Sequence, residues 1–338
     1  SNGIVPTTQT PSELLKKFTT PSGVQYENLI KSVNIDEVTS EQISRVEKLS
    51  GKKVHPFLSR HIFFAHLRLN EFLDDVEAGR KTYVLVQLIP NKEVGLTEFL
   101  VLSFAKYLQE ALNQYVVVQV LDDYKVIQRE STPTEAQKLS NEIIKYVIAF
   151  GFDTEKTFVF TDYSKFGMLY RTVSTLQKAT PCNSVQSFFN FETSDNTGKY
   201  SYPAVLAAPM FAAALPEAFA DSARCLVLDC IIKAEFYNTL SSIADTIQYT
   251  KPSVIFFQVV PQLGGVAKCD AITAQNMILL SDNQKEVERK INKVAFSGGR
   301  DTMEEHRRLG GQCDIDVSFQ YIRFFSNNDE EVNEIQKK

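Results

Sequence analysis

The sequence has no tryptophan and few cysteines or histidines, and these absences argue against several kinds of protein. Its five cysteines are odd in number and include no Cys-x-x-Cys pair, so neither a disulfide framework nor a zinc ribbon is expected. The apolar runs are far shorter than a membrane-spanning helix, and no secretory signal segment opens the chain. We therefore expect a cytoplasmic protein with free thiols and no membrane partner.

Three of the four histidines, His55, His61 and His66, lie close together in the sequence. No other segment rich in metal ligands accompanies them. We therefore expect partly buried or helix-capping roles for these side chains, and no bound metal.

The charge balance is slightly acidic, with 36 lysines and arginines against 41 aspartates and glutamates. This balance argues against a uniformly basic surface for DNA. A local basic face remains possible, because contacts with phosphate depend on local rather than total charge. The 338 residues, of which 43% are apolar and 23% charged, are enough for two globular domains.

Strand-like and helix-like segments alternate through the middle of the chain. Short apolar runs predict strands at 83–88, 115–121, 157–161, 224–231 and 253–260. Helical spacing, caps and glycine stops predict helices at 40–50, 70–78, 100–112, 132–150, 164–178 and 235–247, whereas residues 185–222 look irregular. Strands separated by helices of this length predict an α/β fold with a parallel sheet.

Beyond residue 283 the strand signals disappear, and helices are predicted at 285–294, 302–309, 315–325 and 329–338. We therefore expect three parts. Residues 1–80 form a lead-in and a helical segment packed on the core, 81–282 form a Rossmann-like domain, and 283–338 form an all-helical domain.

The most specific stretch is Asn-Lys-Val-Ala-Phe-Ser-Gly-Gly-Arg-Asp-Thr at 292–302, followed by Cys-Asp-Ile-Asp-Val-Ser-Phe-Gln-Tyr at 313–321. Upstream stand Arg-His-Ile-Phe-Phe-Ala-His at 60–66, Gly-Phe-Asp at 151–153 and Gly-Lys-Tyr-Ser-Tyr-Pro-Ala-Val-Leu-Ala-Ala-Pro at 198–209. In this order they resemble eukaryotic-type tryptophanyl-tRNA synthetases, which are class I aminoacyl-tRNA synthetases. The resemblance runs from about residue 25 to the end. Chains of that family normally continue further, so a terminal helical portion is either missing from this protein or lies beyond the given sequence.

The resemblance implies a Rossmann-like catalytic domain that uses ATP and Mg, a homodimer, and a helical anticodon-binding domain that serves tRNA(Trp). It places Lys293, Arg300, Asp301 and Thr302 at the RNA, where arginine and aspartate can hydrogen-bond the edges of unpaired bases. The structural alternative is that Gly298-Gly299 shapes a turn, Asp301 caps the next helix and Arg300 is a surface charge.

The first class I signature, His-x-Gly-His, has no match. Aligned through the following helix it falls on residues 96–99, and aligned through Val94-Gly95 it puts Glu93 and Leu96 at the histidine positions. Both alignments lose both histidines and introduce a carboxylate, which repels a triphosphate. The preceding Thr-Gly-Arg-Gly-Pro turn of the family is Val-Gln-Leu-Ile-Pro here, so side chains replace both glycines and narrow the nucleotide site.

The second signature, Lys-Met-Ser-Ala-Ser in the family, is Lys-Cys-Asp-Ala-Ile at 268–272. Lys268 is a catalytic remnant in one interpretation and a solvated surface lysine in the other. In the tryptophan pocket Leu85 and Tyr124 replace the family's tyrosine and glutamate, and Gln119 is the remnant of the polar set. The alternative for Gln119 is a polar residue satisfied at a strand end.

We therefore predict a tryptophanyl-tRNA synthetase homologue that has lost catalysis, binds neither ATP nor Mg, and retains tRNA(Trp) binding. Two alternatives stay open: a pseudo-subunit that pairs with an active synthetase, and an active tryptophan–tRNA ligase with an atypical site. The state of one site distinguishes these hypotheses. The ligand site at the sheet edge is either open or filled by the apolar side chains Leu85, Ile89, Leu96, Phe99 and Ile232.

Overall fold

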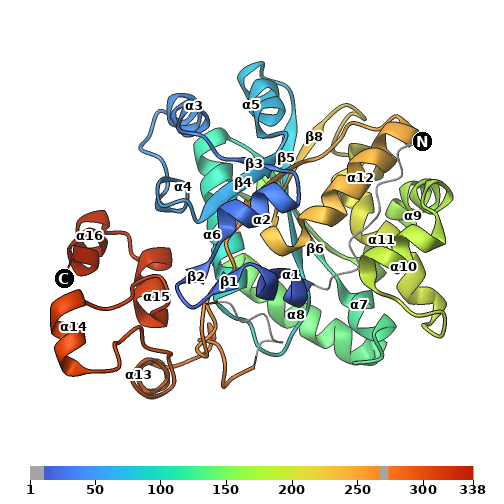
Figure 1. Cartoon of the computed structure of the whole chain (residues 1–338). Coiled ribbons are helices and arrows are strands. Elements are labelled where there is room, and N and C mark those ends of the chain that lie inside the picture. The colour runs from blue at the N-terminus through green and yellow to red at the C-terminus, as the bar shows by residue number, and fades with distance from the viewer. Residues whose placement is uncertain (1–10, 267–272, 338) are drawn as a thin grey trace.

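The computed structural model describes residues 11–266 and 273–337 and contains a seven-stranded sheet in the order β3-β4-β9-β8-β5-β6-β7 (Figure 1). Its strands are β3 (Asp36–Glu37), β4 (Phe63–Leu67), β5 (Thr82–Leu88), β6 (Tyr115–Val120), β7 (Thr157–Thr161), β8 (Arg224–Cys230) and β9 (Ser253–Phe257). A separate hairpin pairs β1 (Thr19–Thr20) with β2 (Gly23–Val24).

The sheet is parallel from β9 to β7, and helices cover both of its faces. Successive side chains of a strand point to opposite faces. In β5, Val84 and Val86 therefore join the core on one face of the sheet, whereas Tyr83 and Leu85 join the core on the other face. The predicted α/β fold with a parallel sheet is confirmed.

The helices up to the end of the sheet are α1 (Pro11–Lys17), α2 (Tyr26–Ser32), α3 (Ser40–Ser50), α4 (Pro56–Ser59), α5 (Leu69–Glu77), α6 (Leu96–Leu112), α7 (Asp122–Ile127), α8 (Pro133–Ala149), α9 (Asp162–Ala179), α10 (Cys182–Phe189), α11 (Thr197–Ala207) and α12 (Ala234–Ile247). Their ends follow local chemistry. The Thr132 side chain caps α8 and forms a capping box with Glu135, and Gly51 closes α3 in the left-handed conformation. Among the described residues no helix combines the length and apolar character needed to cross a membrane.

Two expectations about local structure are wrong. The stretch 185–222, expected to be irregular, contains most of α10 and all of α11. Helix α11 is buried at Tyr202, Pro203, Ala204, Val205 and Ala207. Because consecutive residues are buried and a proline lies inside the helix, the alternation of polar and apolar residues that identifies a surface helix is missing.

The second error concerns β4, because no strand was expected before residue 80. All five residues of β4 are buried, and the strand pairs antiparallel with β9. A short run that is apolar on both faces lacks the alternation that distinguishes a strand from a buried helical segment.

The four helices predicted near the C-terminus are present as α13 (Gln284–Lys293), α14 (Met303–Leu309), α15 (Val317–Phe325) and α16 (Asp329–Lys337). They form the orange and red group at one side of the α/β region (Figure 1). Arg60 joins the two groups, since its guanidinium pairs with Asp329 at 2.7 Å and donates to the carbonyl oxygens of Arg323 and Ser326.

Candidate functional site

A cleft opens at the carboxyl ends of β5 and β8, the neighbouring strands between which the order of the sheet reverses. Ligands of open α/β sheets bind at this position. The cleft has a volume of about 310 Å³. Its polar lining consists of Gln87, Asn91, Thr97, Glu98, Asp229, Lys233 and Gln262.

The apolar side chains expected as possible fillers do not close the cleft. Ile89 and Ile232 line it. Leu85 is buried in the sheet, and Leu96 packs against Leu263 and its neighbours. Phe99 packs against the rings of Phe150 and Phe325 with centroid distances of 5.6 and 5.8 Å. The cleft is therefore open.

Gln87 closes the side of the cleft that faces β6. Its Nε2 donates to Oε1 of Gln119 and to the carbonyl oxygen of Leu206, both at 2.7 Å. One side chain thus joins β5, β6 and α11. It stands where the family turn has a glycine, so this bridge has no counterpart in a chain that keeps the glycine.

Gln119 is completely buried and does not line the cleft. Its oxygen accepts from Gln87, and its Nε2 donates to Oδ1 of Asp162 at 2.6 Å. Both halves of the amide are therefore hydrogen-bonded inside the protein. This geometry agrees with a satisfied polar residue at a strand end, and a role for Gln119 in binding an amino acid stays a prediction.

Asp162 belongs to a buried acidic cluster with Asp122 and Asp123 at the ends of β6 and β7. Burial raises the pKa of Asp123 to about 6, although its hydrogen bond with Asp162 lowers it. Burial and then repulsion from Asp123 raise the pKa of Asp162. The negative charge of each carboxylate thus disfavours ionisation of the other. Sequence reasoning did not single out this pair, because Asp123 lies in the first turn of α7 and Asp162 in the first turn of α9, far apart in the sequence.

The N-terminus of α6 also faces the cleft, and a carboxylate of the same helix occupies it. Gly95 is the N-cap residue, and its backbone N–H donates to Oε2 of Glu98 at 2.9 Å. Burial raises the pKa of Glu98, while its hydrogen bonds to backbone N–H groups lower it. Free N–H groups at a helix N-terminus attract phosphate, and an internal carboxylate takes that place here.

Lys233 is the cationic side chain of the cleft lining, and it is paired. Its Nζ lies 3.0 Å from Oδ1 of Asp229, whose Oδ2 accepts from the Tyr237 hydroxyl at 2.6 Å. The positive charge is thus compensated locally. Sequence reasoning did not single out this pair, since nothing in its spacing distinguishes it from a surface ion pair.

The predicted RNA-facing residues lie on the segment 292–302, which runs from the end of α13 to the N-cap residue of α14 and which we call the RNA-facing loop. Lys293 and Asp301 are exposed, and the half-buried Arg300 donates through Nε to the Gly310 carbonyl oxygen at 3.1 Å. The Thr302 side chain caps α14 by accepting from the Glu305 N–H at 3.1 Å. Capping by Asp301, the structural alternative, is therefore wrong, and its carboxylate faces solvent.

Gly298 fixes the shape of this loop. Its N–H donates to Oδ2 of Asp316 at 2.9 Å, and its carbonyl oxygen accepts from the Gln312 N–H at 2.8 Å. A Cβ atom at this position would lie 2.3 Å from the Gln312 carbonyl oxygen. Only glycine permits that approach, so the loop is held firmly while Lys293 and Asp301 stay exposed.

Comparisons with known proteins identify the family, although no family model matches the chain. Human cytoplasmic tryptophan–tRNA ligase is 37% identical over 322 residues, which cover 93% of this chain and 68% of the human protein. The Arabidopsis thaliana cytoplasmic enzyme is 34% identical over 320 residues, covering 93% and 80% of the two chains. The chain belongs to the tryptophanyl-tRNA synthetase family.

Solved structures of tryptophanyl-tRNA synthetases agree with this assignment. A tryptophanyl-tRNA synthetase homologue from Entamoeba histolytica superposes with a TM-score of 0.93 and 51% identity, covering 96% of this chain and 86% of that one. The tryptophan-bound enzyme from Encephalitozoon cuniculi has a TM-score of 0.86 and 28% identity, covering 94% and 87%. The shared fold therefore extends through both the α/β and the helical parts.

The resemblance to tryptophanyl-tRNA synthetases implies a site for ATP with magnesium in this cleft. Glu98 puts a negative charge where phosphate would approach, and Lys233 is already paired with Asp229. No group of metal-ligating side chains that could hold an ion occurs within residues 11–266 and 273–337. Lys268, the predicted remnant of the second signature, lies outside the described residues.

Proposed function

We propose that this protein is a noncatalytic member of its family that binds tRNA(Trp) in the cytoplasm. The observation that supports this most strongly is the carboxylate of Glu98 on the first turn of α6. In an enzyme that activates an amino acid, the phosphates of ATP would need this end of the helix. A carboxylate close to a triphosphate is repulsive by several kcal/mol at low effective dielectric.

The chemistry of adenylate formation also needs positive groups that stabilise charge developing on the phosphates. Lys233 is the cation on the described cleft wall, and Asp229 neutralises it. Gln87 occupies additional space beside β6. We therefore propose that neither ATP nor magnesium binds productively, and that the cleft persists as part of the fold.

The helical part supports RNA binding, because Lys293 and Asp301 are exposed on a loop whose backbone is fixed. Arg300 keeps donor groups beyond the Nε that bonds Gly310. Single-stranded anticodon bases are read by hydrogen bonds to their edges, and phosphates are held by lysine and arginine. These residues are suited to both contacts.

Two measurements test the proposal. Filter binding compares tRNA(Trp) with other tRNAs over a range of salt, and tryptophan-dependent exchange of pyrophosphate into ATP measures catalysis. We expect preferential, salt-sensitive binding of tRNA(Trp) and no exchange. Equal binding of all tRNAs would remove the RNA assignment, and exchange activity would establish the alternative of an active ligase with an atypical site.

Arg300→Ala sharpens the binding test. We expect it to weaken tRNA(Trp) binding and reduce the preference over other tRNAs by about 1–3 kcal/mol. Arg289→Ala is the matched control, because Arg289 lies on α13 outside the segment 292–302 and pairs with Glu286 of the same helix. Equal losses from both variants would indicate a general charge effect instead of base reading.

A homodimer is also proposed, and an aromatic patch on α9 gives it a surface. Tyr163, Phe166 and Tyr170 are 49, 40 and 55% exposed. The rings of Phe166 and Tyr170 contact each other with centroids 5.6 Å apart. Exposed aromatic clusters are typical of protein interfaces.

Light scattering of the wild-type protein should give twice the chain mass, and Tyr170→Glu should give monomers. A dimer that forms only with an active synthetase would favour the pseudo-subunit.

A further inference from the structure

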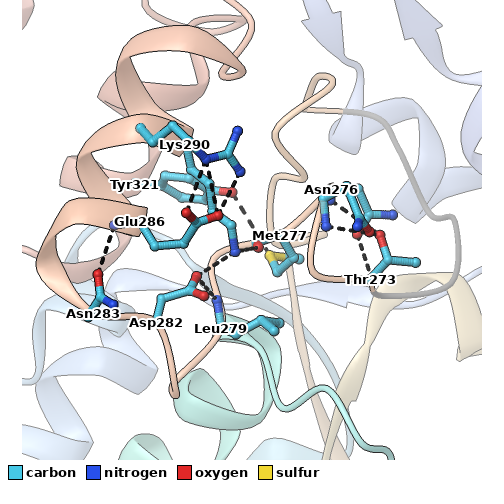
Figure 2. Close-up of polar contacts among 11 residues, drawn as sticks. Thr273, Asn276, Met277, Leu279, Asp282, Asn283, Glu286, Lys290 and Tyr321 are labelled. Atoms are coloured by element: carbon cyan, nitrogen blue, oxygen red, sulfur yellow. Dashed lines mark hydrogen bonds and ion pairs between the residues drawn. The ribbon is translucent and has the colours of Figure 1, made fainter.

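Lys290 on α13 is a completely buried lysine, which is rare unless the charge is paired. Its ammonium donates to the Met277 carbonyl oxygen at 3.0 Å and to Oδ2 of Asp282 at 2.5 Å (Figure 2). A buried ammonium that loses its partner strongly destabilises a protein, because an uncompensated charge is left away from water. These two acceptors therefore fix the position of α13.

Both acceptors lie on residues 273–282, which we call the connector because they lead from the cleft to α13. Met277 lines the cleft. The Asp282 carboxylate also accepts from the Leu279 N–H at 2.8 Å (Figure 2). The connector then runs along the start of α6, where the Leu280 N–H donates to the Val94 carbonyl oxygen at 2.9 Å.

A second contact from the helical part reaches the segment that follows β9. The hydroxyl of Tyr321 on α15 donates to the Pro261 carbonyl oxygen at 2.8 Å. The same hydroxyl lies 3.9 Å from the Met277 sulfur (Figure 2). Gln262, the next residue, lines the cleft. The helical part thus holds two walls of the cleft, one through Lys290 and one through Tyr321.

The same lysine stands directly before the RNA-facing loop. The Lys290 carbonyl oxygen accepts from the N–H groups of Val294 and Ala295 at 3.1 and 2.9 Å, which ends α13. The Phe296 N–H then donates to the Leu263 carbonyl oxygen at 2.8 Å. A continuous set of contacts therefore leads from the start of the loop through Lys290 to the connector and the cleft wall.

We propose that Lys290 is a positioning residue that joins the RNA-facing loop to the cleft wall, so that RNA bound at the loop restrains the connector and the start of α6. The proposal rests on the proposed binding of tRNA(Trp). An ion pair is directional, so it fixes the orientation of α13 on the connector more sharply than apolar packing does. RNA that holds the loop therefore reduces local unfolding of the connector and of the start of α6.

Hydrogen–deuterium exchange of the full chain, with and without a tRNA(Trp) transcript, tests this coupling. In the wild-type protein we expect slower exchange at the loop 292–302 and also at 277–282 and 94–98. In Lys290→Met we expect tRNA to protect the loop alone, with affinity weakened roughly 3- to 30-fold. Lys285→Met is the matched control, because Lys285 is an exposed lysine of the same helix, and it should keep the remote protection.

Asp282→Asn is the second variant if Lys290→Met does not fold. It removes the charge and keeps an oxygen that can accept from Leu279, and we expect it to reduce the remote protection in the same way. Wild-type protection confined to the loop would overturn the coupling and leave RNA binding intact. Absence of tRNA binding would overturn both proposals. Remote protection that survives in both variants would show that Lys290 does not carry the coupling.

Discussion

The edge of the cleft and the loop after α13 use their polar side chains in opposite ways. Beside the cleft, the Gln119 side chain forms hydrogen bonds with Gln87 and with Asp162. The Glu98 carboxylate accepts a hydrogen bond from the N-cap residue of its own helix. In the loop the structural bonds come mainly from the backbone and from Asp316, while Lys293 and Asp301 remain exposed. Polar groups that satisfy each other offer little to a ligand, whereas exposed groups on a fixed backbone can still bind one.

The largest expected effect comes from removing the fixed shape of the loop. In Gly298→Ala the new methyl group would lie 2.3 Å from the Gln312 carbonyl oxygen, so the backbone must shift. We expect a loss of about 3 kcal/mol in the free energy of unfolding, typical of an overpacked site, together with loss of tRNA binding. Urea unfolding and filter binding measure the two effects.

Gly299→Ala is the control for this variant. The nearest atom to its added methyl group is the Ser297 hydroxyl oxygen at 3.6 Å, an ordinary contact. We expect a change within about 0.5 kcal/mol, as for most surface substitutions. If both variants unfolded at the same urea concentration, the close approach at Gly298 would not be what shapes the loop.

The acidic cluster predicts the next largest effect, a dependence of stability on pH. Folding raises the pKa of Asp123 from 3.8 to about 6, so the folded state holds this proton more tightly than the unfolded state. The free energy of unfolding should therefore fall as the pH rises from about 4 to about 6, and then level off with respect to this group. Asp123→Asn should be more stable than wild type by about 3 kcal/mol at pH 7.5.

Thermal unfolding of wild type and Asp123→Asn between pH 4 and 8 measures this difference. The two curves should approach each other toward pH 4, where the wild-type carboxyl is protonated in the folded state and partly protonated in the unfolded state. Parallel curves across the whole range would mean that folding does not raise the pKa of Asp123. This measurement shows whether the polar groups near the cleft interact mainly with one another, in contrast to those of the loop after α13.

Much of the fold was predictable because its signals are local. Helix α8 lies within the predicted range 132–150, with Thr132 as its cap, and β7 has the predicted bounds. The chemistry of the cleft was less predictable, since it depends on which side chains meet. Gln87 was recognised as a replaced glycine, but its bond to Gln119 requires β5 and β6 to be in register. The burial of Lys290 was also not predictable, because most residues of α13 are charged or polar and nothing in the sequence distinguishes this lysine from the exposed ones.

The smallest expected effect on stability, and the sharpest test of the cleft, is Glu98→Gln. The glutamine oxygen can still accept from the Gly95 N–H, so we expect the free energy of unfolding to change by less than about 1 kcal/mol. Removing the charge should nevertheless allow weak binding of ATP, measured by equilibrium dialysis, where the wild-type protein binds none. Equal ATP binding by both proteins would mean that the carboxylate on α6 is no barrier to nucleotide, and the contrast between the two regions would then have to rest on Gln87 alone.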